Sequence, residues 1–183
     1  KAEGREVALA VPEMKLWSPS DPYLYGLQIR VVRDGQTVDV IKGYAAMRKI
    51  SYAEDAAGHK RMHLNNEPLF QYGPLDQGWW PDGLYTAPSD EALAFDIEKT
   101  KEMGFNTIRK HVKVEPARWY WHCDRLGMLV WQDMPSIADN STNVWDNRTY
   151  ENGTDTPVTE EGKANYYKEW GEIMDALSFF PSI

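Results

Sequence analysis

Three stretches of the sequence carry charged, hydrogen-bonding and aromatic side chains that could bind a polar ligand. Their candidate binding residues are Asp76, Trp79, Trp80, Arg109, His111 and Asp133. A carboxylate accepts hydrogen bonds from hydroxyl groups, an imidazole can hydrogen-bond through either nitrogen, and aromatic rings stack on the apolar C–H faces of sugars. The combination is typical of a carbohydrate-binding site, and we expect these side chains to bind such a ligand.

Each of these residues also has a structural interpretation. His111 could be tied to a neighbouring carboxylate instead of a ligand. Arg109 is expected to point inward on its strand and to form a buried ion pair with an acid such as Asp133, which would organise the pocket. Asp133 could bind hydroxyl groups itself or serve only that arginine. Two adjacent tryptophans cannot both face one pocket from an extended segment, so either Trp79 or Trp80 is expected to pack in the interior.

The first part of the chain, up to residue 50, has the pattern of β-strands. Apolar residues alternate over 27–31, Asp34 and Gly35 indicate a tight turn, and a second apolar run covers 38–41. These features predict a hairpin. A complete immunoglobulin-like sandwich needs about 100 residues, so residues 1–52 are expected to form the C-terminal part of one.

From residue 53 onward, predicted strands alternate with predicted helices. A hairpin with its turn over 65–68 makes the transition. The elements that follow are a helix from Ser89 to Gly104, a strand over 105–109, a helix from Pro116 to Gly127, a strand over 128–133, a polar loop over 134–158 and a helix from about Thr159. The apolar run over 128–131 predicts a strand buried on both faces of a parallel sheet.

This order of elements opens either a doubly wound sheet or an eightfold barrel. A Gly-rich phosphate loop follows none of the predicted strands, which argues against a nucleotide-binding sheet. We therefore expect residues 53–183 to form the first three strand–helix units of a TIM (β/α)8 barrel. Function in such barrels collects at the carboxyl ends of the strands, where the candidate binding residues lie.

Composition excludes several classes of partner. The chain of 183 residues has a formal charge of -8 and lacks a polybasic segment, so we expect neither nucleic-acid nor membrane binding. Cys123 is the only cysteine, and the spacing of His111, His122 and Asp133 does not fit a metal site. We expect no metal and no cofactor. The sequence does not fix the compartment, although it favours a periplasmic or extracellular protein slightly over a cytoplasmic one.

Five segments, in their order and spacing, resemble glycoside hydrolase family 2, the β-galactosidase and β-glucuronidase family. These segments are 16–25, 43–50, 64–69, 104–111 and 123–133. The resemblance implies a glycoside hydrolase acting on O-glycosyl compounds: a retaining, β-galactosidase-like exo-β-glycosidase, with one Glu as acid/base and another as nucleophile about 5–5.5 Å apart. It leaves open a homo-oligomeric parent enzyme. The alternative is a carbohydrate-binding module that uses the same aromatic residues without catalysis.

The resemblance also implies roles for particular positions. In that family the acid/base follows an Asn at the end of the fourth barrel strand, and the nucleophile lies on the seventh. We expect both to lie beyond Ile183, so no residue of this chain receives a catalytic role. His111 matches a histidine that contacts substrate, and Asp133 matches an acidic position at the end of the third strand. Residues 76–80 replace a loop that is His-rich in familiar β-galactosidases, which argues against galactose as the sugar.

Overall fold

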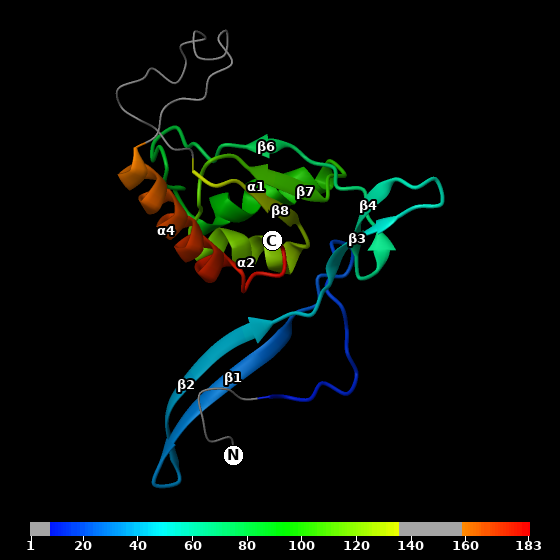
Figure 1. The fold of residues 1–183 in the computed structure, drawn as a ribbon. Coiled ribbons are helices and arrows are strands. Elements are labelled where there is room, and N and C mark those ends of the chain that lie inside the picture. Colours follow the sequence, from blue (N-terminus) through cyan, green and yellow to red (C-terminus); the bar gives the residue numbers. More distant parts are fainter. Residues whose placement is uncertain (1–7, 136–158) are drawn as a thin grey trace. The chain divides into compact units, whose positions relative to one another are not determined.

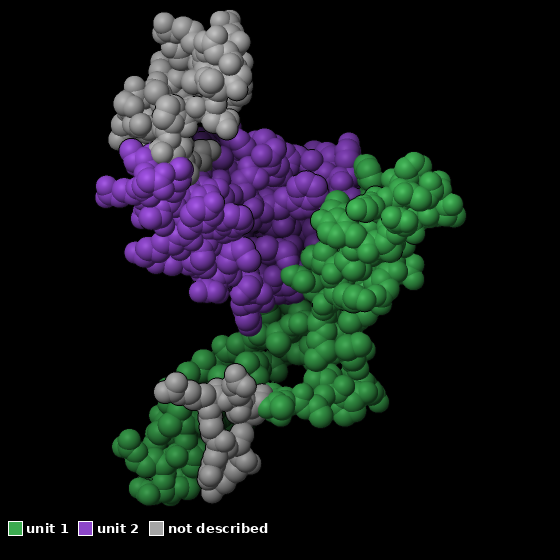
Figure 2. Space-filling model, in the orientation of Figure 1, with its two compact units in different colours: residues 1–70 green, residues 71–183 purple. Residues whose placement is uncertain are grey.

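The structure, a computed structural model, describes residues 8–135 and 159–183 and divides the chain into two compact units. The units are Lys1–Phe70 and Gln71–Ile183 (Figure 2). The boundary expected from the sequence, between residues 52 and 53, lies ahead of this division because a small sheet spanning it belongs to the first unit. The assignment of the two predicted domains stays a prediction. Nearly all of the predicted loop over 134–158 lies outside the described residues.

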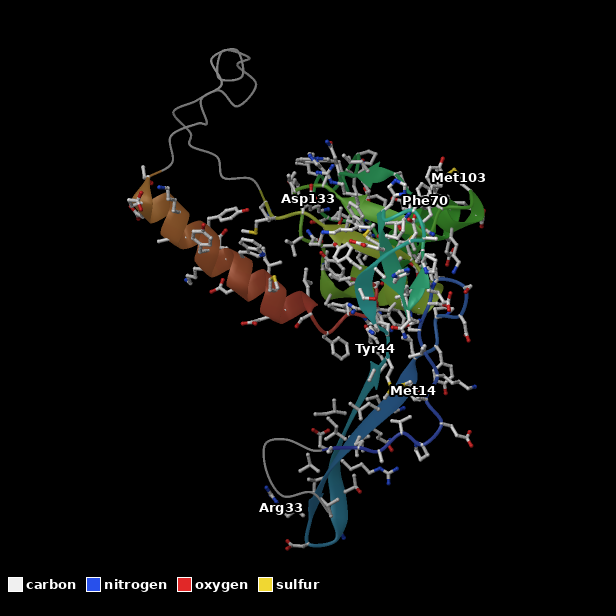
Figure 3. The ribbon with its side chains drawn as sticks, turned by 45° about the vertical axis from the view of Figure 1, so that its right-hand side comes forward. Met14, Arg33, Tyr44, Phe70, Met103 and Asp133 are labelled. Atoms are coloured by element: carbon white, nitrogen blue, oxygen red, sulfur yellow. The ribbon has the colours of Figure 1, made fainter. Side chains whose placement is uncertain are left out.

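The first unit begins with the predicted hairpin, which the structure confirms (Figure 1). Strand β1, Tyr25–Arg33, pairs antiparallel with β2, Gln36–Ala45. The two residues between them, Asp34 and Gly35, have φ angles of 50° and 80°, the left-handed backbone that a tight hairpin turn requires. Figure 3 labels Arg33 beside this turn.

A three-stranded antiparallel sheet completes the first unit, in the order β3-β4-β5. Its strands are β3, Ile50–Glu54, β4, Lys60–Leu64, and β5, Glu67–Pro68. The turn predicted over 65–68 is shorter than expected, because only Asn65 and Asn66 leave the ladder, with φ angles of 55° and 69°. Asparagine tolerates that conformation, and Pro68 is acceptable because β5 is an edge strand.

The second unit alternates strands with helices. Its elements are β6, Leu75–Asp76, α1, Asp90–Glu102, β7, Thr107–Lys110, α2, Ala117–Leu126, β8, Leu129–Gln132, and α4, Glu160–Leu177 (Figure 1). The sheet has the order β6-β7-β8, and both pairs are parallel. Asp76 is in register with Lys110, and Lys110 with Gln132, so the last residues of the three strands meet at one edge.

Local capping signals explain where the helices begin and end. Ser89 Oγ accepts a hydrogen bond of 3.2 Å from the Ala92 amide at the start of α1. Gly104 follows α1 with φ +90° and Gly127 ends α2 with φ +73°, a conformation that costs glycine little. The two helices run in the same direction, since Arg118 near the start of α2 pairs with Asp90 and Arg125 near its end pairs with Glu98, further along α1.

The two faces of the β6–β8 sheet differ in exposure. Ile108 and Val130 are buried on one face, against which α2 packs, and α1 packs against α2. Trp131 points to the other face and is 48% exposed, whereas Leu129, which alternation places on the same face as Trp131, is only 3% exposed. The expectation that the run over 128–131 is buried on both faces is therefore wrong at Trp131 and holds for the other three residues. A strand alternates its side chains, so Trp131 shares its face with the half-exposed Arg109, its partner in the register. None of the helices that the structure describes is both long and apolar enough to cross a membrane.

Candidate functional site

The predicted ion pair between Arg109 and Asp133 forms at the carboxyl edge of the sheet. Arg109 Nε donates to Asp133 Oδ1 at 3.0 Å and Nη2 donates to Oδ2 at 2.8 Å. Figure 3 labels Asp133 where the chain leaves β8. The guanidinium holds the pKa of the Asp133 carboxyl below its usual value, so the carboxylate is ionised near neutral pH. The expectation that the pair is buried is wrong: the Arg109 side chain is 50% exposed, because it lies on the open face.

His111 lies directly after β7, beside this ion pair. Its backbone amide donates to the Asp76 carbonyl at 2.9 Å, which fixes the residue next to the end of β6. The imidazole also lowers the pKa of Asp133, by less than Arg109 does. Its Nδ1 is buried and lacks a hydrogen-bond partner among the residues that the structure describes. A ring nitrogen in that state has an unused hydrogen-bonding capacity.

The two tryptophans after β6 have different environments. Trp80 exchanges backbone hydrogen bonds of 2.8 Å and 3.0 Å with Leu84, and its ring is half-buried. Trp79 is exposed and contacts Tyr85 edge to face, with ring centroids 4.4 Å apart. Trp79 is therefore the tryptophan that presents its ring to solvent, and Trp80 is the one that packs, in line with the expectation that only one of them faces a pocket.

Asp76 is engaged in holding the chain after β6. Its Oδ1 accepts from the Gly78 amide at 2.7 Å, and its Oδ2 accepts from Lys110 Nζ at 2.5 Å. Both carboxylate oxygens thus have protein partners. The structure places Asp76 beside the other candidates, in a supporting position, and a contact between Asp76 and substrate stays a prediction.

A buried polar cluster behind this edge was missed from the sequence. Lys110, 1% exposed, lies between Asp76 and Glu115, with its Nζ 2.9 Å from the Glu115 carboxylate and 4.3 Å from the centre of the Trp119 ring. Lys113, 3% exposed, approaches the same carboxylate at 2.9 Å. Lysine and glutamate are seldom fully buried unless they are paired. A signal that could have found Lys110 is strand alternation, which sends Arg109 and its neighbour to opposite faces.

Further buried polar groups connect this cluster to β8. The Tyr120 hydroxyl donates to Gln132 Oε1 at 2.5 Å and accepts from the Glu115 amide at 3.1 Å, and burial raises the pKa of this phenol. Gln132 Nε2 donates to the Lys113 carbonyl at 2.8 Å. The last residue of β8 and the chain after β7 are therefore joined.

The structure also bears on cysteine and metal chemistry. Cys123 is fully buried in α2, and burial raises the pKa of its thiol, so it is not a nucleophile. Over residues 8–135 and 159–183, no group of three or more His, Cys, Asp or Glu side chains has an arrangement that could hold a metal ion. His122, which the metal hypothesis included, bonds to Asp90 at 2.9 Å.

Comparisons with known proteins agree with this architecture. The model for glycosyl hydrolases family 2 matches residues 1–48. A β-galactosidase from Lactococcus lactis is 28% identical over 131 residues, which is 71% of this chain and 12% of that protein. A β-glucuronidase structure from Bacteroides uniformis is 26% identical with a TM-score of 0.57 over 66% of this chain and 15% of that one. A β-glycosidase structure from Bacteroides vulgatus, 22% identical, has the same fold over 92% of this chain and 20% of that one, with a TM-score of 0.67.

The first curated relatives are much longer than this chain, which spans between 12% and 18% of their length. The family model and these relatives cover both units between them. In both units the chain is therefore similar to glycosyl hydrolases family 2.

Proposed function

We propose that this chain is part of a retaining exo-β-glycosidase and that the carboxyl edge of the β6–β8 sheet is one wall of its sugar-binding site. The observation that carries the proposal is the set of groups at that edge. The second unit carries three such groups: the ionised carboxylate of Asp133, the Nδ1 of His111 that has no hydrogen-bond partner among the described residues, and the exposed ring of Trp79. Carboxylates and imidazoles hydrogen-bond sugar hydroxyl groups, and an exposed indole stacks on a pyranose.

We further propose that the β6–β8 sheet is the start of a (β/α)8 barrel. Along a strand, successive N–H groups point to opposite edges. The Leu129 amide bonds to Asn106, ahead of β7, and the next amide, of Val130, bonds to the Ser182 carbonyl at 2.7 Å. Residues at 182–183 thus occupy the edge of β8 away from β7, where a fourth parallel strand would lie. In such a barrel the open face that carries Arg109 would turn toward the interior.

The chemistry that we propose for the whole enzyme is hydrolysis through two glutamates that lie outside this chain. A nucleophilic glutamate forms a covalent glycosyl–enzyme intermediate, and the acid/base glutamate first protonates the leaving group and then activates water. The residues of this chain hold and orient the sugar. The Arg109 guanidinium keeps Asp133 ionised and fixes the direction of its oxygens. Each of these oxygens keeps a second lone pair, which can accept a hydrogen bond from a sugar hydroxyl group.

The test uses the full-length protein and aryl β-glycosides of galactose, glucuronic acid and glucosamine. We expect hydrolysis of at least one of them, with the β-anomer released first in the NMR spectrum. Asp133→Asn should lower kcat/KM for that substrate by about 10- to 100-fold, the equivalent of one charge-assisted hydrogen bond. Asp175→Asn, at an exposed carboxylate of α4 in the same unit, is the matched control and should leave kcat/KM unchanged.

Different failures point to different conclusions. Release of the α-anomer first would refute retention. Sugar binding without hydrolysis of any glycoside would identify a carbohydrate-binding module instead. Full activity of Asp133→Asn would show that this edge of the sheet is not part of the substrate site.

A further inference from the structure

We infer that Lys113, buried behind the sheet edge, is a positioning residue that holds the segment 78–85 in place and thereby sets how the exposed Trp79 ring meets substrate. The inference rests on the proposed function for its substrate part. Lys113 is 3% exposed, and the glycosidase resemblance gives it no role. Its Nζ contacts both ends of the segment that carries Trp79.

The first contact is a hydrogen bond to the backbone. Lys113 Nζ donates to the Gly78 carbonyl at 2.6 Å, one residue before Trp79. The second is a contact with an aromatic face, since the same Nζ lies 5.0 Å from the centre of the Tyr85 ring. Tyr85 in turn contacts Trp79 edge to face. One ammonium group therefore constrains Trp79 in two ways, through the carbonyl of the residue before it and through the ring of Tyr85 beside it.

The segment between these contacts is closed by its own backbone. The amide of Trp80 donates to the Leu84 carbonyl at 2.8 Å, and the amide of Leu84 donates back at 3.0 Å. The Thr86 amide donates to the Gly83 carbonyl at 2.9 Å. A segment that is short and internally bonded moves as one piece, so its anchor at Lys113 controls the position of the whole piece.

The anchor itself is fixed by charges on every side. Lys113 and Lys110 share the Glu115 carboxylate at 2.9 Å each, and Lys110 also pairs with Asp76. Two ammonium groups thus face two carboxylates, which is the pairing that buried charges require. Gly78 fits tightly against this cluster: a Cβ there would lie 2.4 Å from the Glu115 oxygen and 3.0 Å from each lysine Nζ. The segment therefore fits against the cluster in one position and can shift little.

The test compares four variants in the full-length protein: Lys113→Met, Glu115→Gln, the double variant and Lys99→Met. Lys113→Met removes the ammonium group at similar length and leaves the cluster with excess negative charge. The double variant restores the charge balance but lacks the hydrogen bond to Gly78. Lys99→Met changes an exposed lysine of α1 and is the matched control.

Two measurements are made on each variant: KM and kcat for the aryl β-glycoside that the wild type hydrolyses best, and amide hydrogen exchange of residues 78–86. We expect Lys113→Met to raise KM about 10-fold with kcat nearly unchanged, since the contact orients bound substrate without acting on the transition state. Exchange over 78–86 should accelerate by a similar factor. The double variant should recover thermal stability while KM and the exchange remain altered, and Lys99→Met should match the wild type.

The outcomes separate the inference from the proposed function. Recovery of wild-type KM by the double variant would overturn the inference, because buried charge and not the Gly78 contact would then set substrate binding. Unchanged exchange over 78–86 in Lys113→Met would also overturn it. If the wild type hydrolyses no glycoside, the proposed function fails with the substrate part of the inference, and the exchange measurement still decides whether Lys113 holds the segment.

Discussion

Replacing Gly78 with alanine should destabilise the segment 78–86 far more than the same replacement destabilises the end of α1 at Gly104. Both glycines have a positive φ, +67° at Gly78 and +90° at Gly104. Alanine in that region costs about 1–2 kcal/mol, so both variants carry a similar backbone penalty. The difference in destabilisation between the two variants therefore measures the effect of the atoms that surround the new methyl group.

The surroundings of the two positions are opposite. At Gly104 a Cβ would meet nothing within 4 Å, whereas at Gly78 it would lie 2.4 Å from Glu115 Oε1. The Glu115 oxygen cannot retreat easily, because it is buried, accepts a hydrogen bond from Lys110 at 2.9 Å and forms an ion pair with Lys113 at 2.9 Å. Either the ion cluster opens or the segment lifts away from it.

The cheaper response sets the magnitude. Breaking a buried charge pair costs about 3–5 kcal/mol. Lifting the segment breaks at least the 2.6 Å hydrogen bond from Lys113 to the Gly78 carbonyl, which is worth about 1.5–3 kcal/mol because its donor is charged, and weakens the 2.7 Å bond from the Gly78 amide to Asp76. We therefore expect Gly78→Ala to cost about 2 kcal/mol more than Gly104→Ala, close to a 30-fold difference in the local opening equilibrium.

Hydrogen exchange in the full-length protein measures this local opening directly, without assuming that a large protein unfolds in one step. The informative amides are those of Trp80, Leu84 and Thr86, which bond within the segment. Amides of the β1–β2 hairpin should be unaffected in both variants and serve as the internal reference. The comparison is between the loss of protection over 80–86 in Gly78→Ala and the loss at the end of α1 in Gly104→Ala. Equal losses would refute the reasoning, because the clash with the cluster would then have no energetic cost.

Three further predictions concern other contacts. Arg109 lowers the pKa of Asp133, so this pair should stabilise the protein fully above about pH 4 and lose its contribution as the pH falls through the lowered pKa; unfolding midpoints from acid to neutral pH should show this slope, and Asp133→Asn should lack it. Ser89→Ala should destabilise the first turn of α1 by about 1 kcal/mol, measured by exchange, whereas Ser89→Asn should keep the cap. Asp124→Ala should cost at least about 1.5–3 kcal/mol, because the buried Asp124 accepts from the Ser182 amide at 2.9 Å and alanine leaves that amide without its acceptor; unchanged exchange at Ser182 would contradict this.

The parts of the fold that local chemistry determines could be predicted from the sequence. A serine that accepts from an amide three residues later begins α1, glycines with positive φ follow α1 and α2, and the Asp34–Gly35 turn joins β1 to β2. Each of these signals acts within a few residues of the chain. They fix where elements begin and end without any knowledge of what packs against them.

Burial was harder to predict, because it depends on residues far away in the sequence. The apolar run over 128–131 has the composition of a strand covered on both faces, yet Trp131 is half exposed. The pair of Arg109 with Asp133 was predicted, since opposite charges at the ends of neighbouring parallel strands must meet. Its exposure was not, because composition does not tell which face of a sheet carries the helices.

The alternation of β7 connects what was predicted with what was missed. Arg109 and Lys110 are adjacent cations, so one of them must point to the open face and the other toward the helices. Arg109 takes the open face and orients Asp133, and Lys110 enters the buried cluster that supports Gly78. The ion pair and the segment that carries Trp79 therefore have separate supports on the two sides of one strand. Changes at residues 79–86 should therefore alter the aromatic surface around Trp79 without disturbing the Arg109–Asp133 pair.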